Sequence, residues 1–259
     1  MEKSFWNAGM TIRSILLAGA VLMCAMPLRA GAFPIPERLE FEISYSGILA
    51  GRAVQEVIRE GDEVHIISTA KSASWLKVFF PVDDRIESIL VSGSSQHSIG
   101  TPRLYRIRIR EGRTHFNREA VFDHRTLEAR TKDYVDNSEK VTHITEQTYD
   151  TLSSFFFFRS IPFQVGTSYS IDIFDCKKLM NTEVQILRRE VIKTRLGRFK
   201  TVVIKPMLKS EGVFDRTGDM LIWLTDDERR IPILMKSKVR IGSITATLVG
   251  GTYWPSEKK

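Results

Sequence analysis

Cysteine is nearly absent from this sequence, and its two copies stand where no internal disulfide can join them. Cys24 lies inside an apolar N-terminal run, and Cys176 stands alone in the rest of the chain. If that run is removed, no disulfide and no cysteine-based metal site can form, so stability has to come from packing. Met23 precedes Cys24 where a lipoprotein signal needs a small residue, so we do not expect lipidation. We expect Cys176 to be a half-buried, inert thiol, with pairing between two chains as the alternative.

The spacings that common catalytic and metal sites require are also missing. The five histidines show neither H-x-x-x-H nor H-x-H spacing, and the chain has no G-x-S-x-G and no glycine-rich phosphate loop. Asp123 and His124 are adjacent, but neighbouring residues of a strand point to opposite faces and cannot cooperate. The sequence therefore predicts a protein that is not an enzyme, with no catalytic residue, no metal and no cofactor.

No apolar run is long enough to span a membrane, which takes roughly 20 residues. Ser14–Met26 is apolar, follows the basic residues Lys3 and Arg13, and precedes Ala30 and Ala32, which have the spacing of an A-x-A cleavage site. This pattern predicts a secretory signal peptide over residues 1–32 and hence an exported, soluble periplasmic protein. An uncleaved N-terminal anchor is the alternative.

The sequence also has only a small excess of positive over negative charge. The net charge is +7 for the whole chain and +5 once the predicted signal peptide is removed, and it is spread along the sequence. Such mild, dispersed charge does not indicate a nucleic-acid partner. The 227 residues that follow the signal peptide suffice for one β-rich domain, since sandwiches and barrels reach roughly 200–250 residues. We expect that domain at 33–254 and a frayed tail at 255–259.

The sequence is rich in alternation between apolar and polar residues, which is typical of half-buried strands. Leu39–Ser46 alternates without a break. The apolar segment Ser74–Pro81 departs from the alternation, and we expect it to form a short helical or looped plug. The other predicted strands are 52–59, 63–69, 85–91, 103–110, 114–122, 140–146, 169–174, 182–188, 201–205, 220–224, 231–236, 239–241 and 245–249.

One segment changes period and predicts the single substantial helix. In Tyr149–Ile161, residues Leu152, Phe155 and Phe156 follow the i, i+3, i+4 spacing, Asp150 or Thr151 stands at the N-cap position, and Pro162 ends the segment. Burial of each of its four consecutive phenylalanines contributes about 1.5–3 kcal/mol, so the helix has to pack against a sheet or fill an opening. The alternative is a buried strand over 154–158.

Three arginines form the sharpest electrostatic feature. On a strand, Arg106, Arg108 and Arg110 share one face at ~7 Å spacing, and two such charges repel by about 0.6 kcal/mol in water. Carboxylates on an adjacent strand would neutralise them. The alternative is an anionic partner from the cell envelope, such as a lipid phosphate, bound by the guanidinium groups.

An acidic loop, Asp226–Glu228, separates two predicted strands. Calcium-binding loops place their oxygen ligands at alternate positions around a sharp glycine turn, and this loop has neither feature. We expect a structural hairpin loop in which Arg229 and Arg230 neutralise the acidic residues.

Two segments together carry a resemblance to a known family. The first is YDTLSSFF at 149–156 with Arg159, and the second is Gly218 with WLTDD at 223–227 and RIP at 230–232. With Leu39, Phe41, Tyr45, Gly47, 50–51 and 241–244, they resemble the exported bacterial proteins of the domain-of-unknown-function family 3108 over nearly all of residues 36–250. The resemblance implies a periplasmic all-β protein, a strongly curved open barrel or spiral around a helix, similar to envelope lipoprotein carriers. It implies no catalytic residue, because the family has no established reaction.

We therefore expect an all-β, mainly antiparallel fold, curved into an open barrel, a β-spiral or a sandwich, with one Phe-rich helix packed in or on it. Its concave face, lined by Phe41, Ile43 and Tyr45, would bind an apolar or lipid-like ligand in a carrier of the cell envelope. The partner would be an envelope lipid or an envelope protein. A structural or interaction protein that supports envelope integrity is the main alternative. A hydrolytic enzyme lacks a catalytic constellation, and an outer-membrane barrel would need an apolar lipid face along each strand of ~10 residues.

Overall fold

The first part of the chain folds as a meander, as its alternating residues predict. The computed structural model describes residues 34–92, 99–207, 220–239 and 241–254. Within it, the first eight strands follow one another across the sheet, and each consecutive pair among these eight is antiparallel. These strands are β1 Glu37–Tyr45, β2 Ile48–Glu60, β3 Glu63–Ser72, β4 Asp83–Val91, β5 Thr101–Glu111, β6 Thr114–Asp123, β7 Glu128–Asp133 and β8 Ser138–His143.

The second part forms another meander that returns to the first strand. The short strand β9, Thr148–Asp150, leads into helix α2, Thr151–Ser160, and pairs in parallel with β10. The remaining strands are β10 Ser168–Phe174, β11 Leu179–Thr194, β12 Gly197–Pro206, β13 Met220–Thr225, β14 Pro232–Lys238 and β15 Ser243–Gly251. Because β15 pairs with β1, the described strands form one 15-stranded open sheet whose edges are β8 and β9.

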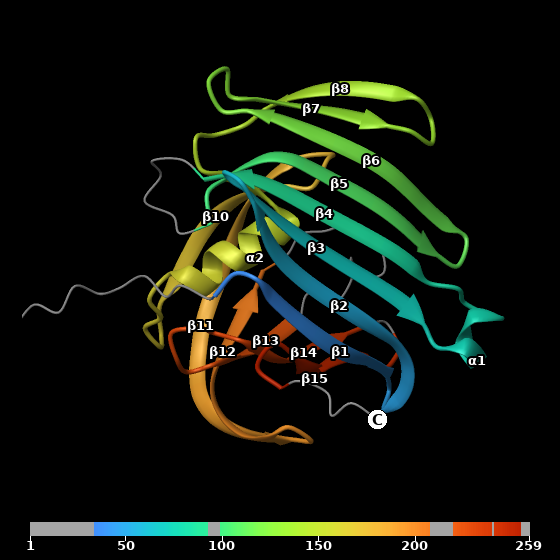
Figure 1. Ribbon diagram of the computed structural model, residues 1–259, viewed down its shortest axis with the longest axis vertical. Coiled ribbons are helices and arrows are strands. Elements are labelled where there is room, and N and C mark those ends of the chain that lie inside the picture. Colours follow the sequence, from blue (N-terminus) through green and yellow to red (C-terminus); the bar gives the residue numbers. More distant parts are fainter. Residues whose placement is uncertain (1–33, 93–98, 208–219, 240, 255–259) are drawn as a thin grey trace, which may run out of the picture.

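The sheet curves around α2 (Figure 1). The helix contacts β3 and β4 from the first meander, and β9 and β10 from the second. Strands from the two meanders thus meet near the helix, and β5 of the first meander also contacts β9 of the second. The predicted all-β class, with a curved open sheet and one Phe-rich helix packed in it, is confirmed.

Helix α2 begins where the sequence predicts, because Asp150 caps it. The Asp150 carboxylate accepts hydrogen bonds from the backbone N–H groups of Leu152 and Ser153, and the Ser153 hydroxyl accepts one from the Asp150 backbone N–H. Phe156 packs into a cluster with β2–β6, while Phe158 packs into a second cluster with β10–β13. Walls on opposite sides of the helix explain why its phenylalanines are not confined to one face.

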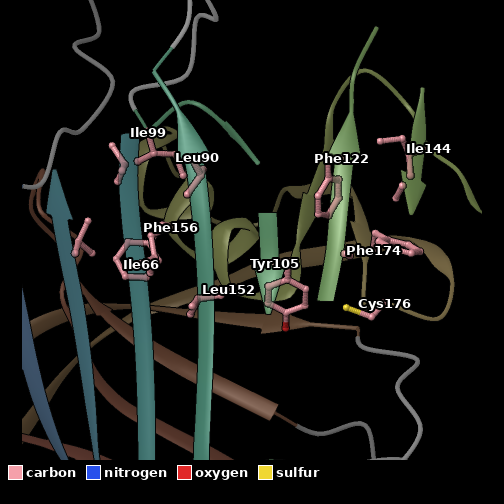
Figure 2. Packing of buried hydrophobic residues seen from close by; sticks show 14 residues of the cluster. Ile66, Leu90, Ile99, Tyr105, Phe122, Ile144, Leu152, Phe156, Phe174 and Cys176 are labelled. Atoms are coloured by element: carbon pink, nitrogen blue, oxygen red, sulfur yellow. The ribbon is translucent and has the colours of Figure 1, made fainter. Parts of the chain in front are cut away.

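Three apolar clusters form the core. Figure 2 shows the first, in which Ile66 of β3 and Leu90 of β4 lie on the same side as Phe156 of the helix, while Phe122 of β6 lies near Phe174. The second lies between α2 and the strands β10–β13. The third is centred on buried residues of β1, β14 and β15, with partly buried side chains from the β11–β12 hairpin packed against it.

The structure differs from the sequence prediction in three segments. Ser74–Lys77 forms the short helix α1, but the segment is not a plug, because most of its apolar side chains are exposed. Strand β7 was not predicted, because its outward residues are charged and its inward ones small or polar. Residues 239 and 241 lie in a turn between β14 and β15 and not in a strand. The predicted signal peptide, the tail 255–259 and Gly218 lie outside the described residues. Among those described, no helix has the length and apolar character to cross a membrane.

Candidate functional site

The arginines of β5 lie on the outer face of the sheet, which points away from α2. Arg106, Arg108 and Arg110 are exposed, whereas Tyr105 on the same strand is buried in the cluster around the helix. Arg106 stands between Glu87 of β4 and Glu119 of β6. Its Nε atom lies 2.6 Å from a Glu119 oxygen, and its Nη1 atom lies 3.8 Å from a Glu87 oxygen. Carboxylates on adjacent strands therefore neutralise Arg106.

We call Arg106, Arg108 and Arg110 the arginine stripe. Its other two members, Arg108 and Arg110, have surroundings that differ from those of Arg106. Arg108 stands between Arg85 of β4 and Asn117 of β6, and no carboxylate of the described chain forms an ion pair with it. Arg110 faces His115 across the β5–β6 pair, and its backbone N–H donates to Asp84 at 2.8 Å. The three residues thus share a face but do not act as one equivalent set.

A pocket of about 330 Å³ lies over β4, β5 and β6 on this outer face. Arg106 and Arg108 line it, whereas Arg110 does not; the other polar lining residues include Arg85, Asn117, Tyr134 and the carboxylates Glu87 and Glu119. Arg118 also borders the pocket, but it is bonded to the Asp133 carboxylate. The pocket therefore offers three exposed guanidinium groups against two carboxylates, beside an amide and a phenol, and this excess of positive charge suits an anionic group.

The three predicted cavity-lining residues differ in how far they are buried. Phe41 is buried in the third apolar cluster, and Ile43 is half-buried. Tyr45 is 42% exposed, and its hydroxyl donates to the Ile241 carbonyl at 2.6 Å. The β1–β15 register runs without a shift from Phe41 to Tyr45, so the three side chains share a face of β1, and Tyr45 is the last residue of that strand. Tyr45 consequently lies at the end of the sheet and not inside it.

Exposed apolar side chains gather at this end, and we call them the apolar rim. Trp75 Nε1 donates to the Leu49 carbonyl at 2.9 Å and so joins the α1 segment to β2. The Tyr45 hydrogen bond joins the same region to the β14–β15 turn, and Phe80 lies against Gly112 of the β5–β6 turn. Figure 1 shows α1 beyond the ends of β3 and β4. The rim consists of Tyr45, Ile48, Leu49, Trp75, Val78, Phe79, Phe80 and Ile241.

The inner wall changes from closed to open in the direction of the rim. Near α2 the inward residues of β3 and β4, such as Ile66 and Leu90, are completely buried. Farther along the same strands the inward positions, among them Ser68, Ala70 and Ile86, are only half-buried. These residues are small or apolar, so the rim borders an accessible inner surface.

Two carboxyl groups meet on the inward side near the rim. Burial raises the pKa of Glu111 to about 7, and the charge of Asp84 and a hydrogen bond with it add to the shift. The pKa of Asp84 is also raised, chiefly by burial, although the Arg110 backbone N–H bond opposes the shift. The pair can therefore hold a proton near neutral pH.

A buried ion pair fixes the C-terminal end of α2. Arg159 is completely buried, and its Nη1 and Nη2 atoms lie 2.6 and 2.7 Å from the two carboxylate oxygens of Glu37 in β1. Arg159 also donates to the carbonyls of Arg229 and Arg230, and the Tyr253 hydroxyl donates to Glu37 at 2.8 Å. Sequence reasoning missed this pair, although a lone arginine in a Phe-rich helix is a signal that a partner is needed.

The acidic loop takes part in the same arrangement. Arg229 pairs with Asp227 at 2.8 Å, as the sequence predicts, but Asp226 pairs with Arg189 of β11. Arg230 instead lies over the Phe163 ring and donates to the Arg159 carbonyl. The two sequence segments that carry the family resemblance therefore meet in space and serve the packing of α2.

The remaining candidate reactive groups are held apart. Cys176 is buried, and burial raises the pKa of its thiol well above the usual value. Asp123 accepts bonds from the backbone of the following turn, whereas His124 Nε2 lies 2.9 Å from the Pro102 carbonyl. In the described part of the chain, no three His, Cys, Asp or Glu side chains are placed to hold a metal ion.

Comparison with known proteins identifies the family and a structural relative. A crystal structure titled as a beta-barrel-like protein of domain of unknown function DUF1849, from Brucella abortus, aligns with a TM-score of 0.54 and 12% sequence identity. The alignment covers 85% of this chain and 98% of that one, and at this identity it shows a shared fold. No curated protein matches the chain. A family model described as "Protein of unknown function (DUF3108)" matches residues 40–249, and the chain therefore belongs to this family.

Proposed function

We propose that the protein is a non-enzymatic binding or carrier module for an apolar or lipid-like ligand, and that it engages a lipid surface through the apolar rim. The observation that carries the proposal is the exposure of this rim. Val78 is 80% exposed and Phe79 is 81% exposed, and both lie beside the half-exposed Trp75. Contiguous exposed apolar side chains of this kind mark interaction sites, because water contact with them is unfavourable.

The charge around the rim favours an anionic lipid surface. Lys77 and Arg113 are exposed at this end, and no ion pair joins either of them to another described residue. Arg113 follows Gly112, which lies against the Phe80 ring. Each basic residue near an anionic membrane contributes about 1 kcal/mol to binding. Apolar contact and electrostatic attraction would therefore act at the same place.

The inner wall supports a carrier role. Ser68, Ala70 and Ile86 extend the accessible surface from the rim toward α2, where Phe156 and its neighbours close the interior. An acyl chain that enters at the rim would pass the Asp84–Glu111 carboxyl pair and then meet small and apolar side chains without displacing the helix. The leader predicted at residues 1–32 suggests that this lipid belongs to the cell envelope.

Vesicle co-sedimentation tests the proposal. Vesicles of phosphatidylcholine with 20 mol% phosphatidylglycerol should bind the protein, and the double variant Val78→Ser/Phe79→Ser should weaken binding at least tenfold. The matched control Val135→Ser/Val141→Ser removes two exposed valines from the region of β7 and β8 and should change binding less than twofold. Binding that is equal in the two double variants would overturn the proposal.

The main alternative is a structural protein whose rim is covered by another envelope protein. The dense packing around α2 is compatible with such a scaffold, since it leaves the helix firmly fixed. Failure of the wild-type protein to bind either neutral or anionic vesicles would favour this alternative. A rim variant that loses a protein partner and not a lipid would establish it.

A further inference from the structure

The outer-face pocket holds an arrangement of charge that the rim does not explain. Across the antiparallel pair of β4 and β5, Arg85 lies directly opposite Arg108. Side chains at such positions have Cβ atoms about 4.5–5.5 Å apart, and like charges there are destabilising. The next position across β6 is Asn117, which is neutral. This row of the sheet therefore carries two positive charges and no negative one.

The neighbouring row shows what a neutralised arrangement looks like on the same strands. There the register aligns Glu87, Arg106, Glu119 and Lys132, so that the sign of the charge alternates from strand to strand. Arg106 makes its 2.6 Å contact with Glu119 in this row. The two rows are adjacent on one face, and only one of them is neutralised. The uncompensated positive charge therefore lies in the row of Arg85 and Arg108.

The partners available to the unbalanced row do not remove its charge. Arg85 reaches only Glu87, at 3.7 Å, and this carboxylate also lies 3.8 Å from Arg106. Arg108 is exposed and forms no ion pair with any described residue. One carboxylate is thus shared, and one guanidinium group is left over.

The shape and chemistry of the pocket fit a small oxyanion. Its volume of about 330 Å³ exceeds the space that a phosphate group occupies, and Asn117 and Tyr134 add neutral hydrogen-bonding groups to its wall. The Glu87 and Glu119 carboxylates in the same wall lie against Arg85 and Arg106, so Arg108 remains without a counter-charge. Guanidinium groups bind phosphate oxygens through paired N–H donors, which a single point charge cannot do. We propose that Arg85 and Arg108 form a binding site for a phosphate group, carried either by a lipid headgroup or by a free phosphorylated solute.

Calorimetric titration at low ionic strength tests the site with inorganic phosphate as the probe. The wild-type protein should bind it, and the affinity should fall as salt rises. Arg108→Gln should weaken binding at least tenfold. The control Arg125→Gln makes the same change in net charge at an exposed turn away from the pocket, and it should change affinity less than twofold.

A second variant should act in the opposite direction. Glu119→Gln removes the carboxylate that neutralises Arg106, so phosphate binding should strengthen severalfold. Absence of phosphate binding in the wild-type protein would overturn the proposal, as would equal effects of Arg108→Gln and Arg125→Gln. Thermal melting of each variant checks that the fold persists, which we expect because Arg108 is exposed.

The source of the phosphate is distinguished with a soluble short-chain phosphatidic acid, used below the concentration at which it aggregates. Binding at least tenfold tighter than that of inorganic phosphate, with the same dependence on Arg108, identifies a lipid headgroup. Equal affinities identify a free phosphorylated solute. Repeating the titration with Val78→Ser/Phe79→Ser separates this site from the rim, because the rim variant should retain phosphate binding.

Discussion

The end of the curved sheet near α2 and the end at the apolar rim differ in which side chains they bury and which they expose. At the α2 end, even a charged side chain is buried, and Arg159 has a carboxylate and two carbonyls as partners. At the rim end, large apolar side chains such as Phe79 are exposed, and no element of the described chain covers them. The first end pairs the charge that it buries, whereas the second exposes large apolar side chains to water. Departures of this kind concentrate at functional sites, which is why we place stability at α2 and binding at the rim.

The largest expected effect comes from breaking the buried ion pair. Arg159→Ala leaves Glu37 buried without its partner, and such losses cost about 3–5 kcal/mol of unfolding free energy. We expect the upper part of that range, because two backbone carbonyls also lose a donor. Denaturant unfolding measures the effect. Arg106→Ala breaks an exposed pair and should cost less than about 1 kcal/mol. Equal costs would contradict the comparison.

A cavity in the helix core should have the next largest effect. Phe156 is completely buried, so Phe156→Ala should lower the free energy of unfolding by about 3–5 kcal/mol, and partial collapse of the surrounding side chains favours the lower values. Phe79→Ala is the matched change at the rim, and we expect about 0.5 kcal/mol or less because the ring is exposed. Chemical denaturation of both variants provides the test, and a large loss at Phe79 would show that the rim is part of the core.

A smaller effect should depend on pH. The pKa of Glu111 is about 7 in the folded protein and near 4.5 for an ordinary glutamate, so the folded state binds the proton more tightly. The resulting stability is fully present below pH 4.5 and is lost as the pH rises through 7. We expect a loss of about 1 kcal/mol after allowance for solvent screening. Glu111→Gln should remove this pH dependence in urea melts, and an unchanged profile would show that the carboxyl pair is not responsible.

The sequence predicted those features that depend on local pattern. Alternation identified most strands, and the spacing of Leu152 and the phenylalanines with an aspartate cap located α2. Strand β8 was predicted only in part, because it is a sheet edge whose residues are almost all exposed and polar. Strand β7 was not predicted at all, because its outward residues are charged and its inward residues are small or polar. A strand that lacks an apolar face gives no period-two signal.

The features that were missed depend on curvature and on contacts between distant residues. Glu37 and Arg159 are 122 residues apart, and only the closure of the sheet around α2 brings them together. The apolar residues of 74–80 led us to predict a buried segment, and most of them are exposed. The prediction was wrong because a sequence pattern does not distinguish a core segment from an exposed apolar surface. The arginine stripe was located correctly on one face, but only strand register shows that Glu87 and Glu119 flank Arg106 while Arg85 faces Arg108.

The contact of the rim with lipid is tested most directly by the fluorescence of Trp75. This indole is half-exposed at the rim, whereas Trp223 is buried in β13 opposite Val203 of β12, and Trp254 is half-buried after β15. Vesicles that contain phosphatidylglycerol with brominated acyl chains should quench part of the emission, and Trp75→Phe should abolish that part. Quenching that is absent, or that persists unchanged in Trp75→Phe, would contradict the account.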